Sequence, residues 1–324
     1  MMRILANDGL SGAGKSALEK AGFEVITTRV AQPQLADFLK SERITALLVR
    51  SATRVDRALI DACPDLQVLG RIGSGLDNID VAYALEKGLQ VVNTPGAGAD
   101  SVAELVFAHL LGGARFLHES NRNMPLEGDS HFKVLKKAYS GGMEVRGKTL
   151  GVVGMGYIGR AVARLGLALG MQVIYTDPDQ NQVVITLSLQ NGSHAVEIPL
   201  RGLELDELLA ASDFVTLHLP AQDTQLIGAR ELGLMKPGSA LINAARGGLV
   251  DEKALLDSLE SGHLQFAALD VFESEPTPAV QVLMHPGLSL SPHIGGSTRE
   301  AQERASLAMA RQVIELLGKQ QSVT

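Results

Sequence analysis

Residues 150–177 read LGVVGMGYIGRAVARLGLALGMQVIYTD, and this segment decides the fold of the chain. A short aliphatic run is followed by G-x-G-x-x-G at Gly154, Gly156 and Gly159, an amphipathic stretch and a second aliphatic run. This order predicts a strand, a glycine turn, a helix and a second strand, which together form one βαβ unit. The first glycine permits a tight turn, the second leaves room for a pyrophosphate, and the third lets the helix pack closely on the sheet. Because a helix start offers free N–H groups and partial positive charge, the segment predicts a dinucleotide site.

Asp177 closes the second strand of this unit. A carboxylate at that place can accept hydrogen bonds from both hydroxyls of a ribose and would repel a 2′-phosphate. The sequence therefore favours NAD over NADP as the cofactor. The alternative is that the glycines form only a packing turn, but the strand, the helical pattern and the acidic residue at the expected distance argue against it.

The composition limits the possible partners of the chain. The sequence contains 36 acidic and 29 basic residues, a formal net charge of −7, which leaves no basic face for nucleic acid or for an anionic membrane. Cys63 is the only cysteine, so we expect no internal disulfide, no cysteine-based zinc cluster and a cytoplasmic location. We found neither a signal-peptide pattern nor a run of about 18 apolar residues, and we expect a soluble protein.

Strand-like and helix-like segments alternate along the chain, which predicts an α/β fold with parallel sheets covered on both faces. A length of 324 residues favours two domains, and Pro/Gly-rich connections at 91–100 and 291–297 mark the places where the chain crosses between them. We expect two Rossmann-like, doubly wound domains. The first is a flavodoxin-like substrate domain at 1–97 and 294–324, to which a long helix at 299–317 returns. The second is a six-stranded NAD-binding Rossmann domain at 98–293.

Residues 9–16, GLSGAGKS, match the Walker A pattern of P-loop proteins, in which Lys15 and Ser16 would bind nucleotide phosphates and magnesium. A P-loop protein also needs a hydrophobic strand that ends in an aspartate for the metal. The next two strand-like segments run instead into Thr27-Thr28 and Arg50-Ser51. We therefore interpret residues 9–16 as a turn of small residues that caps the first helix.

Two segments depart from the alternation. Residues 183–198 alternate in hydrophobicity on both sides of Asn191-Gly192, which is the strongest two-residue hairpin signal, and predict an inserted β-hairpin. An added sheet edge or an oligomer contact are two hypotheses for its role. Residues 122–142 are polar, mixed in sign and broken by Pro125 and paired glycines, so we expect them to wrap over a surface before the cofactor strand begins at Lys148.

Arginines gather at the ends of strands in the first domain. Arg50, Arg54 and Arg71 lie at or just beyond two strand ends, and Gly70-Arg-Ile-Gly-Ser-Gly75 follows the second of these strands. Ligands of open α/β sheets bind at the carboxyl ends of the strands, and the guanidinium fork matches carboxylate and phosphate oxygens. This rim predicts a multiply charged anion as the ligand, with Arg50 the strongest candidate; ordinary solvated arginines are the alternative.

Three stretches beyond the βαβ unit carry side chains that packing does not require. Arg246, Glu275 and His293 each follow a strand, and the carboxyl ends of parallel strands meet at one edge of a sheet. We therefore expect the three side chains to converge near the redox end of the dinucleotide. A capping histidine, a solvated glutamate and an arginine at a helix start are the alternatives when each residue is taken singly.

Together with the glycine motif and Asp177, these stretches resemble the D-isomer-specific 2-hydroxyacid dehydrogenase family along most of the chain. The stretches around Arg50, Gly70–Gly75 and Arg246 are most similar to the branch that oxidises D-3-phosphoglycerate. The resemblance implies that His293 exchanges the hydroxyl proton while hydride passes to NAD. It also implies that Glu275 holds the imidazole and that Arg246 grips the substrate carboxylate, and it requires no metal.

The resemblance also implies the binding residues. The cofactor contacts are Gly154, Gly156, Tyr157, Ile158, Gly159, Asp177, Leu219, Ala244, Ala245, Asp270, Gly295 and Gly296. Substrate contacts are Ser74 and Gly75 on the carboxylate and Arg50 on the phosphate, together with Arg71, Arg246 and His293; Arg54 is a weaker candidate. A homodimer through the NAD-binding domain is expected, in which Lys136 and Lys137 could reach across from the partner subunit.

Two other functions stay open at this point. One is a related dehydrogenase or reductase that acts on glyoxylate, hydroxypyruvate or lactate, which only the arginine rim disfavours. The other is an NADH-sensing binding protein of the corepressor type that shares the fold and the three residues. We disfavour it because the sequence has no long disordered arm.

Overall fold

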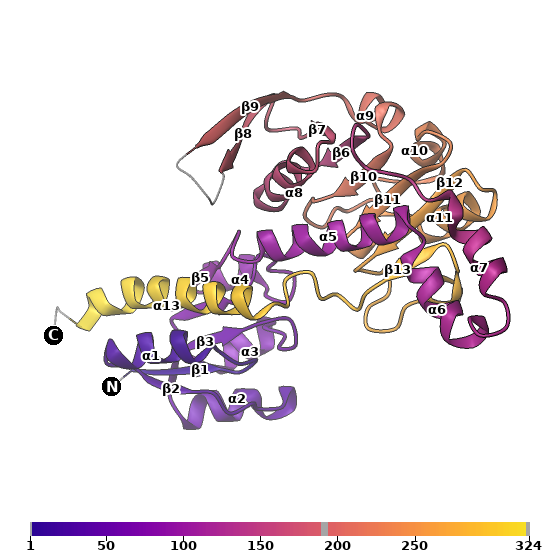
Figure 1. Cartoon of the computed structure of the whole chain (residues 1–324). Helices are drawn as coiled ribbons and strands as arrows, with labels where there is room; N and C mark the ends of the chain where they lie inside the picture. Colours follow the sequence, from indigo (N-terminus) through magenta and orange to yellow (C-terminus); the bar gives the residue numbers. More distant parts are fainter. Residues whose placement is uncertain (1, 189–193, 322–324) are drawn as a thin grey trace. The chain divides into compact units, whose positions relative to one another are not determined.

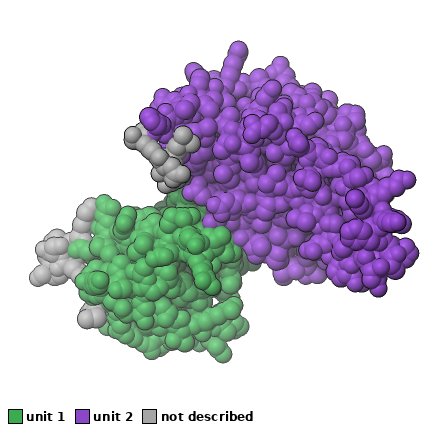
Figure 2. Space-filling model, viewed as in Figure 1, with its two compact units in different colours: residues 1–98, 296–324 green, residues 99–295 purple. Residues whose placement is uncertain are grey.

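The computed structural model describes residues 2–188 and 194–321, which form two compact units (Figure 2). Unit 1 comprises residues 1–98 and 296–324, and unit 2 comprises residues 99–295. The chain therefore passes between the units twice, at 98/99 and at 295/296.

Unit 1 is built on a five-stranded parallel sheet. Its strands are β1 (Arg3–Ala6), β2 (Glu24–Ile26), β3 (Ile44–Val49), β4 (Val68–Arg71) and β5 (Gln90–Asn93). They follow the order β2-β1-β3-β4-β5, which is the order of flavodoxin-like sheets, so the expected fold class is confirmed for this unit. Strand β5 contradicts our assignment of Val91 and Val92 to a connection, because Val91 pairs with Leu69 of β4 at the sheet edge.

The helices of unit 1 cover both faces of its sheet (Figure 1). They are α1 (Gly12–Lys20), α2 (Gln32–Ser41), α3 (Arg57–Ala62), α4 (Val81–Glu86) and α13 (Arg299–Gln321). Helix α13 runs beside α1 (Figure 1), and its buried residues Met309 and Val313 share an apolar cluster with Ile4 and Leu18. The expected long helix that returns to the first domain is therefore present.

Helix α1 also settles the Walker A match. The side chain of Ser11 caps the helix by accepting the N–H of Gly14 at 3.2 Å, and the helix already begins at Gly12. The residues that would have to form a loop around phosphates in a P-loop, from Gly12 to Gly14, are therefore helical. A Cβ at Gly14 would lie 2.8 Å from Cβ of Ser306 on α13, so the small residues serve close helix packing. The P-loop alternative is wrong.

Unit 2 is built on a six-stranded parallel sheet in the order β13-β12-β11-β10-β6-β7, as expected for the second domain. Neighbouring residues of β6 point to opposite faces, since Val152 joins one buried apolar cluster and Val153 the other. The strands are β6 (Thr149–Val153), β7 (Gln172–Thr176), β10 (Phe214–Leu217), β11 (Ser239–Asn243), β12 (Leu264–Leu269) and β13 (Leu288–Leu290). The helices packed on them include α5 (Ala99–Ala114), α8 (Tyr157–Ala168), α9 (Leu205–Ala211), α10 (Ala229–Leu234), α11 (Glu252–Glu260) and α12 (Val280–Met284).

Residues 122–142 are more regular than we expected. They form most of α6 (Leu117–Glu127), then α7 (Phe132–Ala138) and a short 3-10 helix (Tyr139–Gly141). Pro125 lies inside α6 only two residues before its end, so the proline costs the helix little of its length. The break expected at Pro125 is therefore not observed, because the helix continues through it to Glu127.

The predicted hairpin is present as β8 (Gln182–Ser188) and β9 (Ala195–Arg201), which pair antiparallel with Ile185 opposite Ile198. The predicted turn at Asn191-Gly192 lies outside the described residues. The hairpin lies beside α8 (Figure 1), and Val183 and Ile185 are buried in the same cluster as Val162 of that helix. It forms a sheet of its own, linked to β7 by a single bridge between Tyr175 and Gly202.

Candidate active site

The glycine turn between β6 and α8 has the geometry that its sequence predicts. Gly154 has a φ of +94°, and a Cβ there would lie 2.6 Å from the carbonyl oxygen of His218. A Cβ at Gly159 would collide with the carbonyl oxygen of Gly154, whereas a Cβ at Gly156 would meet nothing within 4 Å. Helix α8 starts at Tyr157 without a side-chain cap, so its first N–H groups can bind a pyrophosphate. Tyr157 is exposed and Ile158 half-buried at this helix start.

Asp177 lies directly after β7 and beside the glycine turn. Its Oδ2 accepts the N–H of Met155 at 2.7 Å and the amide of Gln180 at 3.3 Å, and its Oδ1 accepts the N–H of Asp179 at 3.0 Å. These donors hold the carboxylate in place beside the glycine turn. The chemistry of the turn and of this carboxylate therefore fits NAD.

Further along the same edge, three residues predicted to contact the cofactor follow strands β10 and β11. Leu219 comes two residues after β10 and is half-buried. Ala244 and Ala245 directly follow β11 and are buried. Asn243 holds this segment, because its Oδ1 accepts the N–H of Ala245 at 3.1 Å and its Nδ2 donates to the carbonyl of Arg246 at 2.8 Å.

His293 and Glu275 form a hydrogen-bonded pair. Nδ1 of His293 lies 2.8 Å from Oε2 of Glu275, while Oε1 of the same carboxylate accepts the N–H of Phe272 at 3.0 Å. An ionised carboxylate can only accept, so the imidazole must carry a proton on Nδ1. In the neutral ring, Nε2 then remains as the proton acceptor.

The backbone at His293 is held in an unusual conformation. Its φ is +54°, in the left-handed region that residues other than glycine rarely adopt. Asp270 holds the next two residues, since its Oδ1 accepts the N–H of Ile294 and its Oδ2 the N–H of Gly295, both at 2.8 Å. Asp270 is buried directly after β12, and Gly296 already belongs to unit 1.

Arg246 comes from the end of β11, next in the sheet to the strand that precedes Glu275. Its Nη1 donates to the carbonyl of Ala245 at 2.7 Å. A Cβ at Gly247 would collide with the carbonyl oxygen of Phe272, so the segments that carry Arg246 and Glu275 lie in direct contact. Arg246, Glu275 and His293 therefore come from the carboxyl ends of three adjacent strands.

In unit 1, the carboxyl ends of β3 and β4 carry the predicted substrate residues. Asp8, just beyond β1, accepts the N–H groups of Arg50 at 2.7 Å and of Thr53 at 3.1 Å. Asn78 donates to the carbonyls of the same two residues at 2.8 and 2.6 Å. These bonds fix the loop that presents Arg50.

The three arginines of this rim differ in their contacts. Arg71 donates from Nε to Asn78 at 3.2 Å and from Nη1 to the carbonyl of Ile72 at 2.8 Å. Within residues 2–188 and 194–321, the guanidinium of Arg50 has no hydrogen-bond or ion-pair partner. Arg54 is tied to Gln32 through its backbone. Ser74 is exposed and Gly75 half-buried in the loop after β4.

The family model for the NAD-binding domain of D-isomer specific 2-hydroxyacid dehydrogenases matches residues 107–295. The chain belongs to this family. The expected NAD-binding domain is therefore confirmed, and it lies within unit 2.

Similar proteins of this family differ in their named activities. The chain is 37% identical over 319 residues to a D-3-phosphoglycerate dehydrogenase of Methanocaldococcus jannaschii, covering 98% of this chain but 58% of the relative. It is also 37% identical over 322 residues to a hydroxypyruvate reductase of Thermotoga maritima, covering 98% of both. The solved structure of a glyoxylate reductase from Paecilomyes thermophila is 29% identical, with a TM-score of 0.79 over 98% of this chain and 95% of that one. The chain thus spans little more than half the length of the archaeal phosphoglycerate dehydrogenase.

Several residues of this dehydrogenase's site were missed by sequence reasoning. Asp8 and Asn78 organise the loop of Arg50, and Asp8 could have been found as a carboxylate just after the first strand. In unit 2, the hydroxyl of Ser291 is hydrogen-bonded to both His109 and Asp270. His109 lies in an apolar helix, where the sequence gives no sign of its partners.

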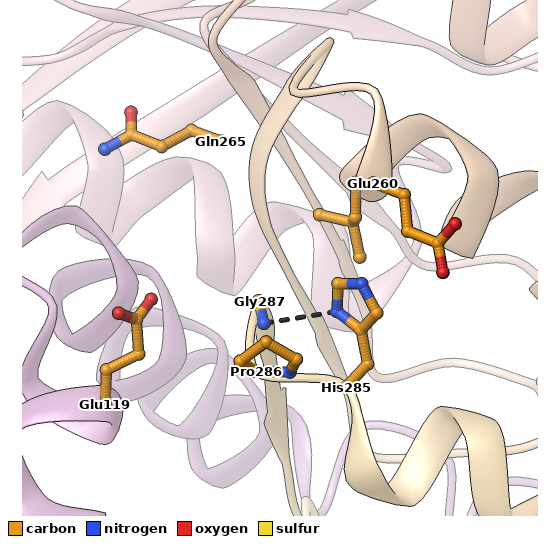
Figure 3. Close-up of a pocket in the computed structure, with 7 residues that line it drawn as sticks. Glu119, Glu260, Gln265, His285, Pro286 and Gly287 are labelled. Atoms are coloured by element: carbon orange, nitrogen blue, oxygen red, sulfur yellow. Dashed lines mark hydrogen bonds between the residues drawn. The ribbon is translucent and has the colours of Figure 1, made fainter. Parts of the chain in front are cut away.

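A cavity of about 530 Å³ lies at the opposite edge of the unit 2 sheet (Figure 3). Gln265 stands at the start of β12 and Gly287 just before β13, so these residues mark the amino ends of the strands. The Nδ1 atom of His285 accepts the N–H of Gly287 at 3.1 Å in its wall (Figure 3). The lining residues are Glu119, Leu259, Glu260, Gln265, His285, Pro286 and Gly287. None of the predicted site residues is among them.

The described part of the chain contains no group of three or more His, Cys, Asp or Glu side chains placed to hold a metal ion. Its helices also lack the combination of length and apolar character that a membrane span requires.

Proposed function

We propose that the protein oxidises D-3-phosphoglycerate to 3-phosphohydroxypyruvate with NAD. The observation that carries the dehydrogenase part is the pair of His293 and Glu275, 2.8 Å apart, on the same sheet edge as the glycine turn. Substrate oxidation needs a base for the hydroxyl proton, a grip on the carboxylate and a hydride acceptor. Residues of unit 2 supply the first two, and bound NAD supplies the third.

In this reaction, Nε2 of His293 takes the hydroxyl proton as the carbonyl forms. NAD bound at the glycine turn would accept the hydrogen of the same carbon together with its electron pair, so that one proton and one hydride would be removed. Glu275 keeps the ring oriented and stabilises the imidazolium that results. Arg246 holds the substrate carboxylate, and its guanidinium orients the reacting carbon.

The phosphorylated substrate is the finer part of the proposal. Arg50 supports it, because its guanidinium has no protein partner in the described residues while its backbone is fixed by Asp8 and Asn78. A charged, preoriented donor without a partner suits a phosphate. We assign the backbone groups of Ser74 and Gly75 to the substrate carboxylate, in addition to Arg246. Arg71 is a lesser contributor, since its Nε and Nη1 are engaged by Asn78 and Ile72.

Hydroxypyruvate reduction is the second candidate. The Thermotoga maritima reductase matches this chain with the same identity as the phosphoglycerate dehydrogenase and over 98% of its own length. Its substrate differs from phosphohydroxypyruvate only by the phosphate, so the two candidates share every step above.

The experiment that separates them compares Arg50→Ala with the wild type on D-3-phosphoglycerate and on D-glycerate, with NAD and with NADP. We expect KM for the phosphorylated acid to rise at least about tenfold, since a charge-assisted hydrogen bond contributes about 1.5–3 kcal/mol. KM for D-glycerate should stay within about twofold of wild type. Arg311→Ala, at an exposed arginine of α13 in the same unit, is the matched control and should affect neither substrate. Equal losses on both acids, or a wild-type preference for unphosphorylated acids, would favour the reductase.

We also propose a homodimer formed through unit 2, in the cytoplasm. Large apolar side chains on α6 and α7 support the dimer, because Leu126 is 77%, Phe132 56% and Val134 63% exposed. Lys136 and Lys137 lie on the same helix α7, from which they could reach the partner's substrate. The buried single Cys63 suits a reducing compartment.

A further inference from the structure

A buried histidine lies behind the proposed site. His109 is 7% exposed in the apolar helix α5, and both ring nitrogens have hydroxyl partners on the segment that leads to His293. Nδ1 lies 2.8 Å from Oγ of Ser289, and Nε2 lies 2.9 Å from Oγ of Ser291. The hydroxyl of Ser291 in turn lies 2.6 Å from Oδ1 of Asp270.

Ser289, His109, Ser291 and Asp270 form a series of hydrogen bonds, and the donor in each bond follows from the Asp270 carboxylate at its end. The carboxylate of Asp270 can only accept, so the hydroxyl proton of Ser291 points to it. The oxygen of Ser291 then accepts from His109, which must carry its proton on Nε2. Nδ1 is left as an acceptor for the hydroxyl of Ser289. Burial lowers the pKa of His109, which agrees with a neutral ring.

Asp270 links this series of hydrogen bonds to His293, the proposed catalytic base. Its two oxygens accept the N–H groups of Ile294 and Gly295, the residues directly after His293. A rotation of the carboxylate would therefore disturb the left-handed turn at His293.

We propose that His109 is a positioning residue for hydride transfer, which donates through Ser291 to hold the Asp270 carboxylate in one orientation. This inference rests on the proposed function, since it takes Asp270, a cofactor contact implied by the family resemblance, to accept the N–H of the nicotinamide amide. His109 touches neither substrate nor cofactor in this proposal. Its effect passes through the hydroxyl of Ser291.

The test uses His109→Leu, Ser291→Ala and His109→Gln in the full chain. Glutamine keeps one donor and one acceptor at a spacing similar to that of the ring nitrogens, whereas leucine keeps neither. We expect kcat to fall at least about tenfold in His109→Leu and Ser291→Ala, and to recover to within about threefold of wild type in His109→Gln. The kcat of the double variant His109→Leu/Ser291→Ala should fall no further than that of either single variant, because each substitution alone already interrupts the same series of hydrogen bonds.

Two measurements distinguish positioning from a structural role. The first compares the Kd of NAD with that of 3-acetylpyridine adenine dinucleotide, which lacks the amide donor; the preference for NAD should shrink in His109→Leu and Ser291→Ala. The second is nitrogen NMR of labelled histidine, which should show His109 as the Nε2–H tautomer in the wild type and lose that pattern in Ser291→Ala. His118→Leu, a second largely buried histidine with no bond to Asp270, is the control.

The proposal would be overturned if His109→Leu had lower thermal stability but an unchanged kcat and an unchanged cofactor preference. A wild-type His109 ring without a proton on Nε2 would also contradict it. If the wild type oxidises no 2-hydroxy acid, the proposed function fails. The cofactor affinities and the tautomer still decide the role of His109 in that case.

Discussion

At the scale of single residues, the glycines of the dinucleotide turn have separable tasks. Gly159 is required by the protein itself, since a Cβ would collide with the carbonyl of Gly154. Gly156 has ordinary backbone angles, and open space surrounds it, so the protein itself has room for a side chain here. Only a ligand that approaches the backbone would require glycine at this position.

We therefore expect Gly156→Ala to fold with a wild-type melting temperature but to bind NAD at least about tenfold more weakly, because lost hydrogen bonds to a charged group cost about 1.5–3 kcal/mol each. Gly159→Ala should instead lose about 1–3 kcal/mol of folding free energy through overpacking. Thermal unfolding and calorimetric titration measure the two effects. Tight NAD binding by Gly156→Ala would show that the pyrophosphate does not approach this turn.

His218, after β10, makes stability depend on pH. Its Nδ1 is buried without a hydrogen bond in the described structure, and burial lowers the pKa of the ring to about 3. The unfolded chain takes up this proton below its ordinary pKa of 6.5, but the folded protein does not. The contribution of neutral His218 to the free energy of unfolding is therefore fully present above about pH 6.5. It decreases by about 1.4 kcal/mol per pH unit as the pH falls from there toward 3.

Urea unfolding at pH 7 and pH 5 tests this expectation. His218→Gln keeps a group that can bond to Thr216, which lies 2.9 Å from Nε2, but cannot titrate. Between pH 7 and pH 5, the free energy of unfolding of His218→Gln should fall by about 2 kcal/mol less than that of the wild type. Exposed His131 is the control, and His131→Gln should follow the wild-type pH dependence. An equal slope for His218→Gln would mean that other groups cause the loss.

At the scale of elements, sequence patterns predicted most strands and helices, including the three-residue strand β2, but missed some others. The βαβ unit and the hairpin strands β8 and β9 were found because their periodicity extends over many residues. Strand β5 was hidden by the Pro/Gly-rich stretch that follows it, and β13 has only three residues. Helices α6 and α7 were missed because their exposed apolar residues do not form one inward-facing stripe.

The hairpin offers an adjacent pair of residues with opposite environments. Ile185 is 3% exposed within the core of unit 2, while its neighbour Thr186 faces solvent. We expect Ile185→Ala to cost about 2–5 kcal/mol of unfolding free energy and Thr186→Ala to change it by less than about 0.5 kcal/mol. Denaturant unfolding measures both. A mild effect of Ile185→Ala would make the hairpin an appendage and not part of the unit.

At the scale of the whole molecule, sequence reasoning identified the fold class, the family and the residues on strand ends. His293 and Glu275 were predictable because parallel strands bring their carboxyl ends to one edge. The contact of His109 with Ser289 was not, since 180 positions separate the two residues and neither belongs to a motif. Asp8 and Asn78 escaped for the same reason: they support the loop of Arg50 from other parts of the chain.

Assembly is the property of the whole molecule that a mutation can test directly. The double variant Leu126→Glu/Phe132→Glu places two charges on the exposed apolar surface of α6 and α7, which we expect to convert a dimer into monomers. Leu85→Glu on α4 of unit 1, where Leu85 is 57% exposed, is the control and should remain dimeric. Analytical ultracentrifugation reports the masses. Wild-type protein that sediments as a monomer would contradict the proposed dimer.

The left-handed backbone at His293 affects how mutations at that position should be interpreted. Alanine fits this conformation poorly, because its Cβ approaches the following carbonyl, whereas asparagine adopts it with much less strain. An activity lost in His293→Ala thus combines a missing imidazole with a relaxed turn, and the change in backbone could be mistaken for chemistry. His293→Asn separates the two, and the difference in rate between these two variants gives the share of the loss that belongs to main-chain geometry.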